Sequence, residues 1–256
     1  MKIVIKLGTS TLAHQTGRLN IRRVEELCKV ISDLKNAGNE IIMVSSGAIG
    51  MGVGKLSLGE KPADIPTKQA AAAIGQCELM YTYDKLFSEY NHTVAQILLT
   101  DEDIADSERC NNFKNTLCRL LELGAIPIIN ENDTIATDEI VIGDNDTLGA
   151  IVSTTIGADL LIILSDIDGL FTADPHTDKN AVMIHTVKDI TPEIEAMTGG
   201  AGTSLGTGGM VTKIKAARIA TKGGTDTVIA NGKDPKILYG IVKGEDKGTK
   251  FLAVRN

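Results

Sequence analysis

Hydrophobic residues along the 256-residue chain form two kinds of pattern that alternate from end to end. Short runs built almost continuously of Ile, Val and Leu have the composition of strands in a parallel sheet that is covered on both faces. We expect strands at Lys2–Leu7, Glu40–Ser45, Thr93–Leu99, Ala125–Asn130, Asp159–Ser165 and Asp226–Ala230.

The longer segments between these runs have the spacing of amphipathic helices. The clearest is Asn20–Ala37, where Asn20 can cap the start and Gly38 can follow the end. Its apolar positions recur every three or four residues and predict one buried face: Ile21, Val24, Leu27, Cys28, Ile31 and Leu34. Further helices are expected at about Pro66–Tyr90, at Asn112–Leu123, after Asp146 and at about Met210–Thr221.

This alternation of strand and helix predicts a doubly wound α/β sandwich with a mainly parallel central sheet. Two polar stretches, Leu56–Lys61 and Ala173–Lys179, are expected to be loops, and neither is long or biased enough to be a domain linker. A chain of this length fits one compact domain with an ample core.

Composition narrows the classes of partner. Lys and Arg number 26 and Asp and Glu number 33, so the formal net charge is 26 − 33 = −7. Aromatic residues make up 3% of the chain, and there is no Trp. Neither a basic stripe nor a stacking platform for nucleic acid is therefore expected. The apolar run in MKIVIKLGTS is too short for a signal peptide or a membrane span, so the sequence predicts a soluble cytoplasmic protein.

The four cysteines show no C-x-x-C pair. Each falls in a stretch that otherwise has a helical pattern, so we expect small core residues in a reducing compartment. They are Cys28, Cys77, Cys110 and Cys118.

Glycine or small polar residues follow the expected strands in KIVIKLGTS, EIIMVSSGA, AIPIINEND, LLIILSDIDG and TVIANG. Ligands of open parallel sheets bind beyond the carboxyl ends of the strands, so these clusters are expected to converge. Gly8–Ser10 and Ser45–Ala48 can offer backbone N–H groups to an anion, although a tight turn needs glycine in any case.

Several polar side chains near this edge need partners. An unpaired ammonium is costly to bury, so Lys6, inside an apolar strand, either meets a carboxylate or serves a ligand. Asp133 and the Asp144–Asp146 segment are expected at the same edge, where a lysine, a magnesium ion or a substrate amino group would relieve their repulsion. Ser165 and Asp166 either form a simple turn or contact a nucleotide.

Two glycine-rich stretches fail the P-loop pattern G-x-x-x-x-G-K-[ST]. Gly206–Lys213 has the composition of a phosphate cradle but the wrong spacing. Gly50–Lys55 has Ile49 where the pattern needs Gly and Leu56 where it needs Ser or Thr. No G-x-G-x-x-G follows a strand, no G-x-S-x-G is present, and the histidines lack metal-ligand spacing, which disfavours dinucleotide enzymes, serine hydrolases and zinc hydrolases.

Six motifs together resemble the glutamate 5-kinase family of the amino acid kinase superfamily. They occur in order over essentially the whole chain: KLGTS at Lys6–Ser10, SSGAI at Ser45–Ile49, PIINEND at Pro127–Asp133, GDND at Gly143–Asp146, SDIDGLFTADP at Ser165–Pro175 and GTGGMVTK at Gly206–Lys213. The resemblance implies an αβα sandwich with the amino acid kinase (carbamate kinase-like) fold, formed by a single domain over residues 1–256.

The resemblance also implies ATP-dependent, Mg²⁺-assisted phosphorylation of the γ-carboxylate of L-glutamate, the first step of proline biosynthesis. It assigns catalysis to Lys6, Lys213 and Asp146, and glutamate binding to Ser46, Asp133 and Asn145 with support from Asn130. Residues expected to bind ATP are Lys6, Gly8, Ser165, Asp166, Thr207, Gly208, Gly209, Met210, Val211, Thr212 and Lys213. The resemblance identifies no direct metal ligand.

Other expectations follow from the same resemblance. Members are commonly dimers or tetramers and are inhibited by proline. Many bacterial members continue into a PUA domain that resembles RNA-binding modules, whereas this sequence ends at Asn256, so no PUA domain is expected. The alternatives are an aspartate, acetylglutamate or nucleoside monophosphate kinase, or a non-catalytic ligand sensor on the same fold. Nucleic acid and membranes are not expected partners.

Overall fold

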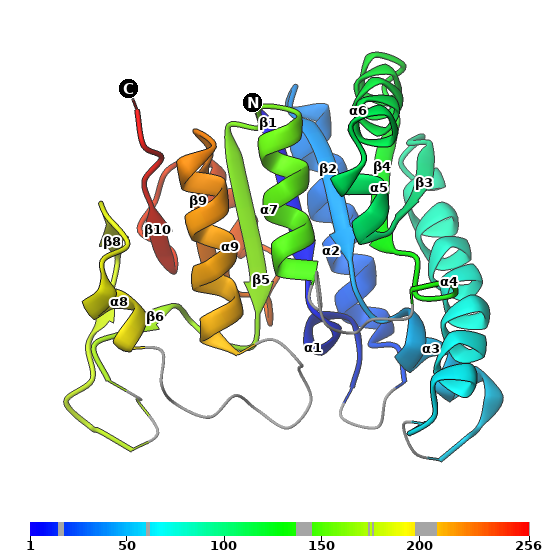
Figure 1. The fold of residues 1–256 in the computed structure, drawn as a ribbon, viewed down its shortest axis with the longest axis horizontal. Helices are drawn as coiled ribbons and strands as arrows, with labels where there is room; N and C mark the ends of the chain where they lie inside the picture. The colour runs from blue at the N-terminus through cyan, green and yellow to red at the C-terminus, as the bar shows by residue number, and fades with distance from the viewer. Residues whose placement is uncertain are drawn as a thin grey trace.

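The computed structural model describes residues 1–14, 18–59, 62–136, 145–173, 175, 177–197 and 209–255. Within that part of the chain, eight strands form one sheet in the order β3-β4-β2-β1-β5-β9-β10-β8 (Figure 1). All neighbours are parallel except β9 and β10. The strands are β1 (Lys2–Leu7), β2 (Glu40–Ser45), β3 (Val94–Leu99), β4 (Ile126–Glu131), β5 (Leu160–Ser165), β8 (Thr186–Val187), β9 (Asp226–Asn231) and β10 (Thr249–Phe251).

Helices cover both faces of this sheet, as Figure 1 shows. One hydrophobic cluster joins the sheet to α2, α4 and α10, and the other joins it to α6, α7 and α9. These helices are α2 (Ile21–Asn36), α4 (Ile65–Ser88), α6 (Ser107–Glu122), α7 (Asn145–Thr155), α9 (Met210–Lys222) and α10 (Ile237–Val242). The remaining elements are short: α1 (Thr9–Leu12), α3 (Ala48–Leu56), α5 (Asp101–Ala105), α8 (Pro192–Ala196) and the antiparallel pair β6 (Leu170–Phe171) and β7 (Met183–Ile184).

The central strand β1 shows why the apolar runs are continuous. Ile3, Ile5 and Leu7 belong to the cluster on the α2 face, whereas Val4 belongs to the cluster on the α7 face. Successive side chains of a strand point to opposite faces, so a sheet covered on both sides needs apolar residues at every position. The predicted αβα sandwich with a mainly parallel sheet is confirmed.

The predicted strands all form, within one residue of their expected bounds. The predicted capping of α2 is also confirmed, because the Asn20 side chain accepts a hydrogen bond from the Arg23 N–H and Gly38 has a φ of +94°. One assignment on α2 was wrong: Ile21 is 62% exposed, since the first turn of the helix extends beyond the core.

Three further predictions need correction. Helix α6 begins at Ser107 and not near Asn112, because the Asp106 side chain caps an earlier, polar first turn through the Arg109 N–H. Leu56 is the last residue of α3 and is not part of a loop. The expectation that the four cysteines are core residues is confirmed only for Cys28: Cys77 is exposed, and Cys110 and Cys118 are half-buried, because they lie away from the buried faces of their helices.

Helix α3 packs backbone to backbone against α4. A Cβ at Gly52 would overlap the carbonyl of Ala71, and one at Gly75 would overlap the carbonyl of Ala48. Glycine is unfavourable inside a helix by up to about 1 kcal/mol, so this reciprocal close approach explains its presence. The approach fixes the start of α3, directly after Ser46 and Gly47.

None of the helices that the structure describes is both long enough and apolar enough to cross a membrane.

Candidate active site

The carboxyl ends of the parallel strands share one edge of the sheet, the lower edge in Figure 1, where the arrowhead of β5 points. The starts of α3, α7 and α9 lie at the same edge, because α3 and α7 follow β2 and β4, which end there, and α9 leads back to the opposite edge, where β9 begins. The convergence predicted from the strand ends is therefore confirmed for the described residues. It brings together groups from segments more than 200 residues apart, such as Lys6 on β1 and Lys213 on α9.

Two buried lysines meet one buried aspartate at this edge. Lys6 Nζ lies 2.6 Å from Asp146 Oδ1, and Lys213 Nζ lies 3.2 Å from Asp146 Oδ2. The lysines are 7% and 3% exposed, and Asp146 is fully buried in the first turn of α7. The three groups carry a net charge of +1, so the cluster is suited to an anionic ligand.

Asp146 is ionised in this arrangement. Burial by itself raises the pKa of the carboxyl group, but the charges of Lys6 and Lys213 outweigh burial and hold the pKa below its ordinary value. The position at a helix N-terminus also favours a negative charge. Asp146 can therefore hold both ammonium groups in place.

Thr212 takes part in the same cluster. Its Oγ1 lies 3.1 Å from Asp146 Oδ2 and 2.9 Å from the Gly209 carbonyl, and can donate a hydrogen bond to either oxygen. The hydroxyl therefore links the N-cap of α9 to the lysine-binding aspartate. The sequence-based assignment of Thr212 to ATP binding did not anticipate this contact.

A second group of side chains surrounds Asn145, the residue next to Asp146. Asn145 Nδ2 donates hydrogen bonds to Ser46 Oγ at 2.8 Å and to Asn130 Oδ1 at 3.0 Å. Asn130 Oδ1 also accepts from the Glu131 N–H, and Asn130 Nδ2 donates to Gln76 Oε1 at 2.9 Å. Three of the predicted glutamate-binding residues are thus joined in one network.

The network leaves one acceptor without a partner. Asn145 Oδ1 is buried and has no hydrogen-bond partner among the described residues. A buried polar atom without a partner is costly, commonly by about 1–3 kcal/mol. The orientation of the amide is set by its donor contacts, so this oxygen is available to a ligand that carries an N–H group.

Most of the remaining predicted site residues are described by the structure, and these lie at the ends of strands or at the start of α9. Gly8 follows β1, and its N–H donates to the Leu164 carbonyl of β5. Ser165 ends β5 and donates to Asp166 Oδ1, while Gly209, Met210 and Val211 begin α9. Asp133 lies in the turn after β4, three residues beyond Asn130. Gly143, Asp144, Thr207 and Gly208 lie outside the described residues.

Three residues at this edge received no role from the sequence, although one of them, Asn231, lies in the strand-end cluster TVIANG. Asn231, the last residue of β9, donates to the Asp166 carbonyl at 3.3 Å and to Asp168 Oδ1 at 2.7 Å, which ties the ends of β5 and β9 together. Gln76 and Tyr83 come from α4, where Tyr83 OH lies 2.9 Å from Ser45 Oγ. A polar residue on the apolar face of a long helix was the available signal for the last two.

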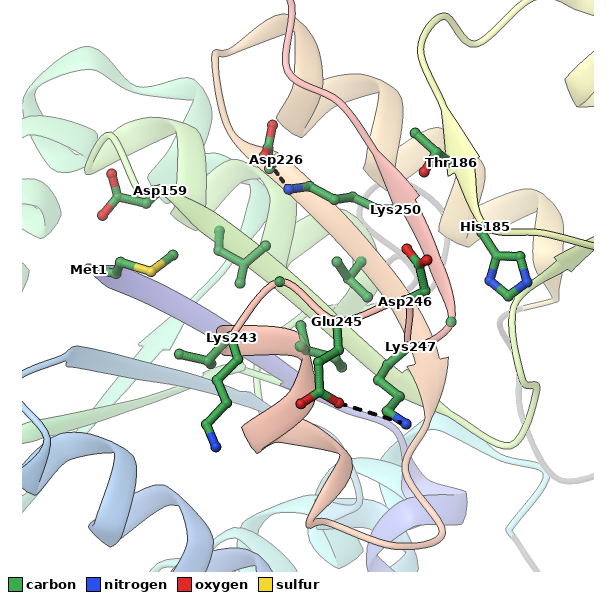
Figure 2. A pocket seen from close by; sticks show the side chains of 16 residues that line it. Met1, Asp159, His185, Thr186, Asp226, Lys243, Glu245, Asp246, Lys247 and Lys250 are labelled. Atoms are coloured by element: carbon green, nitrogen blue, oxygen red, sulfur yellow. Dashed lines mark ion pairs between the residues drawn. The ribbon is translucent and has the colours of Figure 1, made fainter.

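A cavity of about 250 Å³ lies at the other edge of the sheet (Figure 2). Met1, Asp159 and Asp226, which line it, mark the amino ends of β1, β5 and β9. Two ion pairs lie along its lining, Lys250 with Asp226 at 2.9 Å and Lys247 with Glu245 at 3.8 Å. Because it lies at the amino ends of the strands, the cavity is remote from the lysine cluster at their carboxyl ends.

Comparisons with known proteins agree with this fold. The sequence profile of the amino acid kinase family matches residues 1–231. A glutamate 5-kinase of Clostridium perfringens is 56% identical over 257 residues, which cover 98% of this chain and 95% of that protein. One of Caldanaerobacter subterraneus is 53% identical over 256 residues, covering 100% of this chain and 69% of that protein. A carbamate kinase from Giardia lamblia bound to AMP-PNP has a TM-score of 0.72 at 14% identity over 99% of this chain and 98% of its own, which shows a shared fold.

Proposed function

The chain belongs to the amino acid kinase family, and on that premise we propose that it transfers the γ-phosphoryl group of ATP to the γ-carboxylate of L-glutamate. One observation carries the proposal: the Lys6–Asp146–Lys213 cluster lies directly beside the Asn145 amide network. The product is γ-glutamyl phosphate, the first intermediate of proline biosynthesis.

The proposed reaction requires positive charge near the phosphates, and it requires no general base. A glutamate γ-carboxylate has a reference pKa of about 4.3 and is deprotonated at neutral pH, so no residue has to remove a proton. One carboxylate oxygen forms a bond to the γ-phosphorus while the bond from that phosphorus to the bridging oxygen of ADP breaks. The obstacle is repulsion between carboxylate and triphosphate, which the ammonium groups of Lys6 and Lys213 reduce.

The amide network suits the amino acid end of the substrate. At neutral pH the α-ammonium group is the only hydrogen-bond donor of free glutamate. Asn145 Oδ1 is the buried acceptor that lacks a partner among the described residues, so it can receive that donor. Ser46, Asn130 and Asp133 complete the set of residues proposed to bind glutamate.

We propose that Mg²⁺ would enter the site bound to the phosphates of ATP and not to a protein cluster. No group of three His, Cys, Asp or Glu side chains in the described parts of the chain could hold a metal by itself. Mg²⁺ commonly binds through substrate phosphates with few protein ligands, and when bound it neutralises phosphate charge. We propose Gly8, Ser165, Asp166 and the segment from Thr207 to Lys213 as nucleotide-binding residues.

Other members of the superfamily act on aspartate, acetylglutamate or nucleoside monophosphates, and these alternatives are not favoured by relatives at more than 50% identity. A non-catalytic sensor is disfavoured because two buried ammonium groups on one carboxylate are a costly arrangement for ligand binding alone. Assembly into dimers or tetramers and inhibition by proline stay predictions.

The test is formation of γ-glutamyl hydroxamate from L-glutamate, ATP, Mg²⁺ and hydroxylamine by the purified protein. We expect activity with L-glutamate that exceeds activity with L-aspartate, N-acetyl-L-glutamate and UMP in parallel ADP-release assays. N-acetyl-L-glutamate lacks the ammonium group and is the most informative competitor. Absence of hydroxamate, or a preference for the acetylated substrate, contradicts the proposal.

A further inference from the structure

Gln76 lies on α4, behind the residues proposed to bind glutamate. Its side chain is 7% exposed, and its Oε1 accepts the hydrogen bond from Asn130 Nδ2 at 2.9 Å. The other amide atom, Nε2, is buried without a partner among the described residues. An apolar side chain of similar volume would fill this position without that cost, so packing alone does not account for an amide here.

The direction of the contact is fixed by the backbone. Asn130 Oδ1 faces the Glu131 N–H at 2.9 Å and the Asn145 amide nitrogen, both of which are donors. Asn130 must therefore turn its Nδ2 toward Gln76, which has to present an oxygen. A chain of three amides results, running from Gln76 through Asn130 to Asn145.

We propose that Gln76 is a positioning residue for the phosphoryl acceptor, because its Oε1 holds Asn130 and, through Asn130, Asn145 in the orientation that binds glutamate. The inference rests on the proposed function. Gln76 acts from a distance and needs no contact with either substrate.

Helix α4 is a rigid support for this role. Gly75, next to Gln76, brings α4 into backbone contact with α3. Tyr83, seven residues later on the same buried face, lies 2.9 Å from Ser45 Oγ, and the Ser45 carbonyl accepts from Asn145 Nδ2 at 3.4 Å. One helix face thus supports the amide network from β4 through Gln76 and from β2 through Tyr83.

The experiment replaces Gln76 with methionine, which has a similar volume and no acceptor oxygen. We expect the KM for L-glutamate to rise about tenfold, which corresponds to about 1.4 kcal/mol. The KM for ATP is expected to stay within about twofold, since the lysine cluster does not contact Gln76. Gln76→Ala is the second variant: the space it opens admits water as a substitute acceptor, so we expect a smaller rise, about threefold.

Two controls separate positioning from general weakening of the helix. Phe87→Leu alters a fully buried residue of α4 outside the amide network and is expected to lower the melting temperature while leaving the KM for glutamate near the wild-type value. In an Asn130→Ala background, Gln76→Met is expected to add nothing further to the KM for glutamate, because contacts that act in series are not additive.

The outcomes are distinguishable. If the wild-type chain forms no γ-glutamyl hydroxamate, the proposed function fails and the inference falls with it. If the wild type is active and Gln76→Met and Gln76→Ala leave the KM for glutamate unchanged, Gln76 does not position the acceptor. Equal rises in the KM for both substrates, equal effects of Phe87→Leu, or additivity with Asn130→Ala overturn the inference as well.

Discussion

Replacing Asp146 with asparagine tests the central claim that one carboxylate holds two buried ammonium groups. The substitution keeps the shape of the side chain and removes its charge. Lys6 Nζ and Lys213 Nζ, at 2.6 and 3.2 Å from the carboxylate oxygens, then lose their shared counter-ion inside the protein. Two like charges remain close together in a site that water scarcely reaches.

The Asp146→Asn substitution is expected to lower the free energy of unfolding by a large amount that has an upper limit. Breaking a buried ion pair by removing one partner typically costs about 3–5 kcal/mol. The limit arises because an ammonium group that becomes too costly releases its proton. Neutralising a lysine with a reference pKa of about 10.4 at pH 7 costs about 4.6 kcal/mol, at about 1.36 kcal/mol per pH unit. We therefore expect Asp146→Asn to lose about 3–5 kcal/mol at pH 7.

The pH dependence gives the sharper test. An uncompensated buried lysine binds its proton less tightly in the folded state, so the unfolded state holds more protons and stability rises with pH. The deficit of Asp146→Asn should shrink by about 1–3 kcal/mol between pH 7 and pH 9. Urea unfolding at pH 7, 8 and 9, followed by far-ultraviolet circular dichroism, measures this directly in a chain that contains no Trp.

Asp226→Asn is the matched control, because it removes an aspartate from a lysine ion pair outside the site. Lys250 is 42% exposed at its side chain, so solvent screens the charge that is left behind. We expect the control to lose about 1 kcal/mol or less, with no dependence on pH between 7 and 9. A deficit for Asp146→Asn below about 1 kcal/mol at pH 7, or one equally large at pH 9, refutes the claim.

Four further predictions concern the same edge of the sheet. Lys6→Ala and Lys213→Ala should each lower kcat at least about 100-fold in the hydroxamate assay with the fold retained, the usual scale for loss of one electrostatic donor; near-normal kcat values would remove them from the mechanism. Asn145→Ala should raise the KM for L-glutamate about tenfold or more while the KM for ATP changes little; calorimetric titration with glutamate provides a check, and unchanged affinity contradicts the role. Gly75→Ala should lower the melting temperature by about 3–10 °C, since the added methyl group overpacks the α3–α4 contact; a melting temperature equal to that of the wild type would show that the contact relaxes freely. The pKa of Asp146 is held below its usual range, so its contribution to stability is complete above about pH 4 and is lost as the pH falls through the lowered value; acid unfolding between pH 4 and pH 2 should therefore narrow the gap between the wild type and Asp146→Asn.

The sheet was predictable because each strand satisfies the same local demand. Burial on both faces requires apolar residues at every position, and β1, β2 and β5 have them almost without interruption. Residues at the strand ends could be assigned to one edge because parallel strands bring their carboxyl ends together. Lys6, Ser46 and Ser165 were found in this way, and the resemblance to a family supplied Lys213.

Features that depend on contacts between distant segments were not predictable. Helix α3 contains Gly50, Gly52 and Gly54, which argue against a helix unless the close approach of α4 is known. The first turn of α6 is polar, so apolar periodicity placed its start too late. The contacts of Thr212 with Asp146 and of Gln76 with Asn130 can be found only from the folded structure, because residue type and spacing along the chain do not indicate which residues meet.

The start of α7 connects the two parts of the proposed active site. Successive side chains on a helix diverge by about 100°, so Asn145 and Asp146, although adjacent, face different neighbours. Asn145 turns to Ser46 and Asn130, which come from the β2 and β4 side of the sheet. Asp146 turns to Lys6 and Lys213, which come from β1 and α9. In the proposed arrangement the amino acid end of glutamate lies on the first side and the transferring phosphate on the second, so one peptide unit sets the spacing between the groups that bind them, and a fixed spacing of this kind favours phosphoryl transfer.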